Sequence, residues 1–225
     1  MPKLVDHVQR RAEIISANLR IIARDGLAGA TMRALATELG VANGAVGHYF
    51  KNQDELLQAT YEEVFARTNS RAVTRTKGRR GLRALMAMLR EMLPMEELTL
   101  EEARIVVCFW GRVTTGARLL VRLPEEHLAW SRQVGAMLSE AIEDGDLRAE
   151  ADPAALAELL VTTVHAMQVR AVILPDNTSP GVQRGLIEQI LLPWLAPGRS
   201  VRQQWPADIA AIPEPPSQRP ELIEA

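Results

Sequence analysis

Residues 31–50 place a glycine between two short segments of helical character, and this arrangement limits the possible folds more than any other part of the chain. Thr31 precedes an apolar-periodic segment, 32–39, whose first turn its hydroxyl can cap. Gly40 permits the left-handed backbone of a tight turn, and a second short helix is expected over 43–50. The pattern predicts a helix-turn-helix, whose helices cross at about 90–120°.

The side chains of this segment divide into an inner and an outer set. Ala36 supplies the small residue that close helix crossing requires, and apolar residues that would lock the unit together are Leu35, Leu39, Val41, Val46 and Tyr49. The outer face of the second helix is small or polar: Asn43, Gly44, Ala45, Gly47 and His48. Such a face can lie in a DNA major groove about 12 Å wide. An ordinary helical hairpin, the alternative, would usually carry larger apolar residues there.

Helical periodicity continues through the chain, with no convincing strand pair and no internal repeat. Helices are expected over 8–24, from about 51 into a basic junction at 71–80, and over 82–93, 101–123, 125–143, 153–174 and 180–195. The predicted fold class is all-α: an N-terminal three-helix DNA-binding domain followed by a helical bundle. The predicted domains are 1–52 for DNA binding, 53–196 for effector binding and dimerisation, and 197–225 as a tail.

The predicted tail, 197–225, contains six prolines, which rule out a long helix. An extended, mobile segment is expected, part of which Trp205 and Ile209 could hold against the body.

Charge is distributed unevenly although the net charge is only −2. Residues 1–80 carry 13 Lys and Arg against 8 Asp and Glu, and residues 81–225 carry 13 against 20. A basic head on an acidic body suits a domain that contacts DNA phosphates, although chance variation in surface charge stays an alternative.

Several classes of protein are not supported by the sequence. The N-terminus lacks a signal peptide core, no apolar run approaches a membrane span, and Cys108 is the single cysteine, so a cytoplasmic protein without disulfides is expected. No phosphate loop, nucleophile elbow or metal-type histidine spacing occurs, so no catalytic residue, cofactor or metal site is predicted. A helical adaptor that binds only proteins stays the alternative to a DNA-binding regulator.

A resemblance to a known family rests on these same residues. The segment 31–50 (TMRALATELGVANGAVGHYF), followed by DELL at 54–57, resembles the TetR family of repressors. Within that family the chain is similar to the betaine-operon (BetI-like) branch, through PKL near the N-terminus, GHYF at 47–50, FW at 109–110 and VRA at 169–171.

The resemblance implies a homodimer that binds a double-stranded DNA operator and encloses a small-molecule effector. Thr31 and Arg33 would contact phosphate, and His48 and Tyr49 would hold the DNA backbone. Base edges would face Asn43, Gly44, Ala45 and Gly47. The chain departs from the family at two positions. Ala42 replaces the usual Ser or Thr, so Asn43 is expected to cap the second helix, and Gln53 replaces the usual Lys, so Lys51 is expected to take over its phosphate contact.

The effector and dimer sites are assigned from the apolar helices of the body. Candidate pocket residues, each of which could instead be ordinary packed core, are Met86, Leu89, Met92, Phe109, Trp110, Thr114, His127 and Trp130. The resemblance to the BetI-like branch suggests a quaternary amine as the effector, and an aromatic cage containing Trp110 or Trp130 would attract such a cation. His165 is read as a satisfied buried or interfacial histidine. Candidate dimer residues are Leu156, Leu160, Thr163, Met167, Leu186, Ile190 and Trp194. The operator, the regulated genes and activation as opposed to repression stay open.

Overall fold

The protein is described by a computed structural model that covers residues 2–114 and 123–212. The described residues form helices and contain no strand, only an isolated bridge between Leu147 and Leu195. The predicted all-α fold is therefore confirmed. The helices are α1 (Pro2–Gly29), α2 (Met32–Glu38), α3 (Gln53–Thr76), α4 (Gly81–Met92), α5 (Glu97–Val113), α6 (Leu123–Glu143), α7 (Pro153–Ile173), α8 (Pro180–Leu191) and α9 (Ala207–Ala210).

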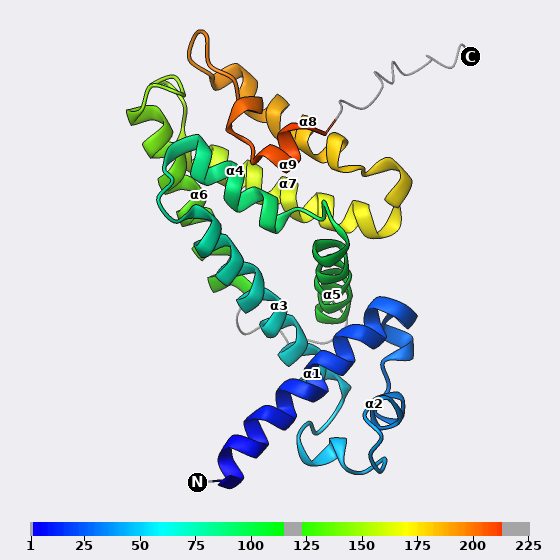
Figure 1. The fold of residues 1–225 in the computed structure, drawn as a ribbon. Helices are drawn as coiled ribbons and strands as arrows, with labels where there is room; N and C mark the ends of the chain where they lie inside the picture. Colours follow the sequence, from blue (N-terminus) through cyan, green and yellow to red (C-terminus); the bar gives the residue numbers. More distant parts are fainter. Residues whose placement is uncertain (1, 115–122, 213–225) are drawn as a thin grey trace, which may run out of the picture.

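Two apolar clusters divide the molecule into a head and a body. The head cluster joins α1, α2 and the first turns of α3, and it includes Ile105 and Phe109 from α5. The body cluster joins α4, α6, α7 and α8 with the far end of α3. Figure 1 shows α3 running from the head into the body, with α5 lying between them. Helix α3 therefore contributes to both clusters, whereas α5 contributes to the head cluster and packs against α7 of the body.

Most helix ends follow local sequence signals. The backbone leaves the helical conformation at Gly26, with a φ of 72° and a ψ of 178°, as the Asp25-Gly26 pair predicts. Asp152 caps α7 by accepting hydrogen bonds from the amides of Ala154 and Ala155, ahead of Pro153 in the first turn. The predicted end of the 101–123 helix falls outside the described residues, since α5 is described only to Val113.

The segment after Pro197 differs from the sequence expectation. Instead of extending away, residues 201–212 fold onto the body through a short 3-10 turn, Arg202–Gln204, and α9. Trp205 and Ile209 are buried in the body cluster, as predicted. Residues 213–225 lie outside the described part of the chain.

Helix α7 lies at the centre of the body. An 18-residue window within it has a mean hydropathy of 1.3, and among the described helices α7 is the one long and apolar enough to cross a membrane by length and composition. The sequence expectation concerned uninterrupted apolar runs, and α7 passes this test of average hydropathy although Glu158, His165 and Arg170 interrupt it. In this structure 44% of that window is buried inside the chain.

Candidate DNA-binding surface and effector cavity

The first half of the DNA-binding surface has the geometry that its sequence predicts. Thr31 Oγ1 accepts a hydrogen bond of 3.1 Å from the amide of Ala34 and caps α2. Gly40 has a φ of 65°, the left-handed conformation that glycine adopts at little cost. A hydrogen bond from the amide of Val41 to the carbonyl oxygen of Ala36 closes the turn, and the side chain of Ala36 is fully buried.

The second half of this surface is shorter than predicted. Instead of a helix over 43–50, the chain forms a turn and then one 3-10 turn, Val46–His48. Gly44 and Gly47 explain the difference, because glycine costs about 1 kcal/mol relative to alanine inside a helix. The predicted cap from Asn43 does not form, since no side-chain cap precedes the 3-10 turn.

The residues expected to meet DNA are available at the surface of the head. Figure 1 shows α2 and the following turn at the end of the molecule opposite the body. Buried Val46 and Phe50 support this turn from beneath, and both belong to the head cluster. The exposed members of the predicted set are Thr31, Arg33, Asn43, Gly44, Gly47, His48 and Lys51, and Ala45 and Tyr49 are half-buried.

Arg11 holds the end of this turn, a role that sequence reasoning missed. Its Nη1 donates a hydrogen bond to the carbonyl oxygen of Tyr49, and its guanidinium carbon lies 4.1 Å from the ring centre of Phe50. The His7 ring lies 4.8 Å from the Tyr49 ring. The first helix therefore positions residues 49 and 50 directly.

Gln53 also has an internal role. Its Nε2 donates to the carbonyl oxygens of Ala30 at 2.9 Å and Leu27 at 3.3 Å, which ties α3 to the loop before α2. Asn52 caps α3 by accepting from the amide of Glu55. The Lys51 side chain is left exposed, as a phosphate contact would require.

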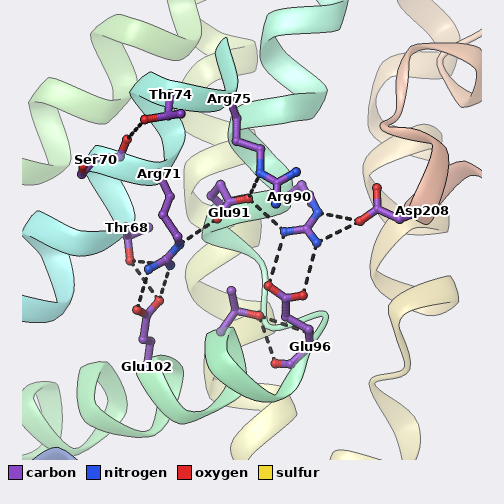
Figure 2. A network of polar contacts seen from close by, with 11 residues as sticks. Thr68, Ser70, Arg71, Thr74, Arg75, Arg90, Glu91, Glu96, Glu102 and Asp208 are labelled. Atoms are coloured by element: carbon purple, nitrogen blue, oxygen red, sulfur yellow. Dashed lines mark hydrogen bonds and ion pairs between the residues drawn. The ribbon is translucent and has the colours of Figure 1, made fainter. Parts of the chain in front are cut away.

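A network of arginines and carboxylates joins α3, α4, α5 and α9 (Figure 2). Its centre is Glu91, whose side chain is 1% exposed and which pairs with Arg71, Arg75 and Arg90 at 2.8–2.9 Å. The predicted basic junction at 71–80 is therefore wrong for its first part. Arg71 and Arg75 lie within α3 because their charges are neutralised across the helix interface.

The network extends from Glu91 in two directions. Arg71 also binds both carboxylate oxygens of Glu102, at 2.9 and 2.6 Å. Arg90 binds Glu96 at the start of α5 and Asp208 in α9, the latter at 2.8 Å. The network therefore extends without a break from Thr68 in α3, which donates a hydrogen bond to Glu102, to Asp208 in α9.

A cavity lies beside this network, between α3, α4, α5, α6 and α7. The volume that the centre of a water molecule can occupy in it is about 30 Å³, which gives room for about two waters. Its lining combines aromatic, apolar and polar residues: Tyr61, Val64, Phe65, Thr68, Glu91, Met92, Thr99, Glu102, Val106, Trp110, Trp130, His165 and Gln168.

Three of the predicted pocket residues, Met92, Trp110 and Trp130, line this cavity. The others do not. Met86 and Leu89 face the packed body cluster, Phe109 stacks on Tyr61 in the head cluster, and Thr114 ends α5 at the surface. The side chain of His127 lies outside the described residues.

Aromatic contacts define the shape of the cavity. Phe65 and Trp130 stack with ring centres 4.9 Å apart, and Trp110 meets His165 edge-on at 4.8 Å. His165 is half-buried on the cavity wall, a position more specific than the general packing role expected from sequence. Tyr61 and Gln168 were missed, because their helices carry apolar residues on more than one face and the sequence does not show which face a cavity will take.

The predicted dimer residues separate into two groups. Leu156, Leu160 and Met167 are buried in the body cluster of the same chain, so their assignment to an interface is wrong. Helix α7 packs its main apolar face against α5 and α6, which uses these side chains internally. The remaining candidates are half-buried or exposed: Thr163, Leu186, Ile190 and Trp194. Leu159, Leu186 and Leu192 are large apolar side chains exposed on α7, on α8 and directly after α8.

Two further sequence expectations concern reactive groups. Cys108 is half-buried, and burial raises the pKa of its thiol although a contact with the Leu27 backbone partly offsets that effect. It therefore stays a protonated thiol at neutral pH, in keeping with a packing role. Among the described residues no cluster of three His, Cys, Asp or Glu side chains could hold a metal.

Comparison with known proteins agrees with this arrangement of head and body. Residues 14–60 match the profile described as bacterial regulatory proteins of the tetR family, and residues 82–193 match the BetI-type transcriptional repressor C-terminal profile. The chain belongs to the TetR family of transcriptional regulators. Its N-terminal region is a helix-turn-helix DNA-binding domain, and its C-terminal region is of the BetI type.

Individual relatives match over part of their length. The regulator PksA of Bacillus subtilis is 36% identical over 122 residues, which cover 52% of this chain and 56% of PksA. The regulator BetI of Paraburkholderia phytofirmans is 39% identical over 92 residues, which cover 39% of this chain and 47% of BetI. The chain therefore spans about half the length of the curated relatives it matches.

Solved structures share the fold over most of the chain. A regulator from Saccharomonospora viridis, solved in complex with choline, has a TM-score of 0.76 at 17% identity and covers 84% of this chain and 98% of its own. A regulator from Rhodococcus has a TM-score of 0.67 at 24% identity and covers 80% of this chain and 96% of its own. At these identities the likeness concerns the fold alone.

Proposed function

We propose that this TetR-family regulator is a ligand-responsive repressor: a homodimer that binds a palindromic operator and releases it when a small molecule enters the body cavity. The observation that carries this proposal is the position of α5. Val106 and Trp110 line the cavity, while Ile105 and Phe109 on the same helix belong to the head cluster. Because the cavity has room for only about two waters, a larger ligand must displace its walls, and a ligand that shifts α5 acts on both regions.

The DNA-binding role is assigned to residues 1–52 and the effector and dimerisation roles to residues 53–196, with 197–225 as a C-terminal segment. Exposed Thr31, Arg33, His48, Lys51 and half-buried Tyr49 supply contacts to the DNA backbone, and the small residues at 43–47 face the bases. A regulator of chromosomal DNA acts in the cytoplasm.

A small cation, such as a quaternary amine, is the proposed effector. Trp110 and Trp130 provide aromatic faces, which attract cations within about 6 Å of the ring centre. Glu91 and Glu102 also line the cavity, and their network joins three arginines to four carboxylates, so one negative charge is in excess. The choline bound by the Saccharomonospora regulator belongs to this chemical class.

Dimerisation is assigned to the outer faces of α7 and α8. Leu159, Leu186 and Leu192 are exposed apolar residues there, and a two-fold pairing would bury them against a second copy. Such a dimer presents its two DNA-binding heads about 34–36 Å apart, or a somewhat larger spacing, along the operator.

An operator-binding assay tests the repressor proposal. The wild-type chain should bind DNA with an affinity that falls steeply as salt rises, because phosphate contacts release counterions. Choline or betaine aldehyde should release the operator. If binding to DNA is absent at low salt, a helical adaptor that binds only proteins becomes the better description. If DNA is bound but no cation releases it, the effector assignment fails and the DNA-binding assignment stands.

A further inference from the structure

The chain after α8 returns to the body as a strap, which we define as residues 201–212. Three apolar side chains anchor it: Val201, Trp205 and Ile209 are 3%, 4% and 5% exposed and belong to the body cluster. The strap lies beyond residue 193, where the match to the C-terminal family profile ends. The family assignment therefore says nothing about its role.

Two arginines of the body hold the strap through its polar groups. Arg184 in α8 is fully buried, and its Nη1 donates to the carbonyl oxygens of Ile209, at 3.0 Å, and Ile212. Arg90 in α4 donates through Nε and Nη2 to Oδ2 of Asp208, at 2.9 and 2.8 Å. The strap is therefore fastened to α8 by Arg184 and to α4 by Arg90.

The contact with Asp208 determines how the planar guanidinium of Arg90 is turned (Figure 2). Because Nε and Nη2 face Asp208, the other edge of the group, Nη1 and Nη2, faces Glu96, at 3.3 and 3.2 Å. Nη1 also donates to Glu91, at 2.9 Å. Strong charge-assisted hydrogen bonds are shorter than the two to Glu96. The pair with Glu96 is therefore the weakest of the three, and it depends most on the orientation that Asp208 imposes.

Glu96 is the residue from which α5 begins. Its amide donates to Thr99 Oγ1 at 3.2 Å, and its carbonyl oxygen accepts from the amide of Leu100 at 2.9 Å. The other end of α5 reaches the head, where Arg112 binds Asp54 of α3 at 2.7 Å. A continuous set of contacts therefore connects the strap, through Arg90 and α5, with the DNA-binding head.

We propose that the strap is a regulatory device that fixes the start of α5, and with it the position of the head, by turning Arg90 toward Glu96. The Asp208 side chain is 50% exposed, so water can replace its contacts when the strap leaves. Arg90 then turns toward Glu91, because that carboxylate is 1% exposed and must keep its partners. Glu96 loses its contact and the first turn of α5 loosens. This inference goes beyond the proposed function, because it needs no ligand in the cavity.

Hydrogen exchange of the full-length chain, measured by mass spectrometry without DNA or ligand, tests this coupling. Trp205→Ala removes an apolar anchor, so exchange within the strap should become at least about tenfold faster. The start of α5, residues 97–103, should become faster by a similar factor. The centre of α6, residues 133–140, should change much less, because it has no contact with Arg90 or Glu96 in the network.

Two further substitutions separate the contact with Arg90 from general loosening of the strap. Asp208→Ala removes a half-exposed carboxylate, so exchange at the start of α5 should become about two- to fivefold faster. Gln204→Ala is the matched control, because Gln204 accepts a 3.2 Å hydrogen bond from Arg83 of α4, outside the network. It should leave α5 unchanged. Adding Asp208→Ala to Trp205→Ala should give no further increase in α5, because the contact with Arg90 is already lost.

A DNA measurement tests whether the effect reaches the head. A duplex that the wild-type chain selects from a random-sequence library serves as the probe, and fluorescence anisotropy gives its affinity. Trp205→Ala should bind this duplex about fivefold more weakly or less tightly still, because the position of the head is no longer fixed. Gln204→Ala should bind it as tightly as the wild-type chain does.

An unchanged α5 in Trp205→Ala, with faster exchange of the strap itself, would overturn the inference. So would an equal rise in α5 and α6, which indicates general destabilisation, or faster exchange of α5 with unchanged DNA affinity. Should Trp205→Ala not fold, Asp208→Ala decides the same questions. Failure to select any duplex would contradict the proposed function, and the exchange measurement would still decide whether the strap holds α5.

Discussion

The DNA-binding turn and the cavity wall differ in what surrounds their polar groups. In the turn, Asn43 and His48 are exposed, and the support comes from apolar Val46 and Phe50 beneath. In the wall, Glu91 is almost completely buried and binds three arginines. A surface that is to bind DNA leaves its polar groups available, whereas a charged group in the interior must be paired inside the chain. Substitutions in the two regions should therefore change different properties.

Removal of the buried carboxylate should have the largest effect. Glu91→Ala leaves Arg71, Arg75 and Arg90 without their shared partner, and we expect the free energy of unfolding to fall by about 3–5 kcal/mol. Urea denaturation measures this loss. Glu143→Ala is the control, because the Glu143 side chain is 70% exposed in its pair with Arg80, and its loss should stay below about 1 kcal/mol. Equal losses in the two variants would show that the network is not buried in solution.

The substitution Gly40→Ala should have the second-largest effect. The φ of 65° at this position costs an L-residue about 1–2 kcal/mol. Both stability and operator affinity should therefore fall. Gly47→Ala is the matched control, since φ is not positive there and an added Cβ meets no atom within 4 Å. It should weaken operator binding while stability changes by less than about 0.5 kcal/mol. An unchanged operator affinity would move Gly47 away from the DNA.

His48→Ala should affect binding and leave folding intact. The side chain is exposed, so the free energy of unfolding should change by less than about 0.5 kcal/mol. Operator affinity should fall by a similar factor for every sequence tested, because a phosphate contact carries no sequence information. Fluorescence anisotropy against a set of operator variants measures both points. A changed ranking of the operators would instead place His48 against the bases.

Asp208→Asn should have the smallest effect, and it depends on pH. Burial alone would raise the pKa of Asp208, but the hydrogen bond and charge of Arg90 outweigh it and hold this pKa below its usual value. The ionised group therefore stabilises the fold at neutral pH, and this contribution is lost as pH falls through the lowered pKa. Because the side chain is half-exposed, the wild-type advantage at pH 7 should be at most about 1 kcal/mol. It should decline once the pH falls below about 4, the usual carboxyl pKa, and vanish only below the lowered pKa of the folded state. Unfolding curves across this range measure it, and a constant difference would contradict the assignment.

Sequence reasoning succeeded where a feature depends on neighbours along the chain. The Thr31 cap and the left-handed Gly40 each involve residues within a few positions, so the local sequence determines the local backbone. It failed for the second element of the helix-turn-helix, where two glycines reduce the expected helix to one 3-10 turn. That failure is also local, because the helical cost of Gly44 and Gly47 was visible in the sequence.

The residues that line the cavity could not be predicted from local sequence in the same way. Arg71 meets Glu102 and Arg90 meets Asp208 across more than thirty and more than a hundred positions, so no spacing rule connects them. Helices such as α4 and α7 are apolar on wide faces, and periodicity does not show which face meets a cavity. Met86 and Leu89 were therefore assigned to the pocket, while Tyr61 and Gln168 were missed.

The sequence by itself determined the all-α fold and the first helix and turn of the segment 31–50, because caps, glycines and apolar periodicity act over a few residues. The family followed from the resemblance of that segment to known regulators. Only the tertiary structure decided which carboxylates are buried, which aromatic rings meet and which residues line the cavity. The physical reason is that burial and pairing are properties of helices brought together from distant parts of the chain. Trp130 and Gln168 belong to one site only because α6 and α7 pack side by side.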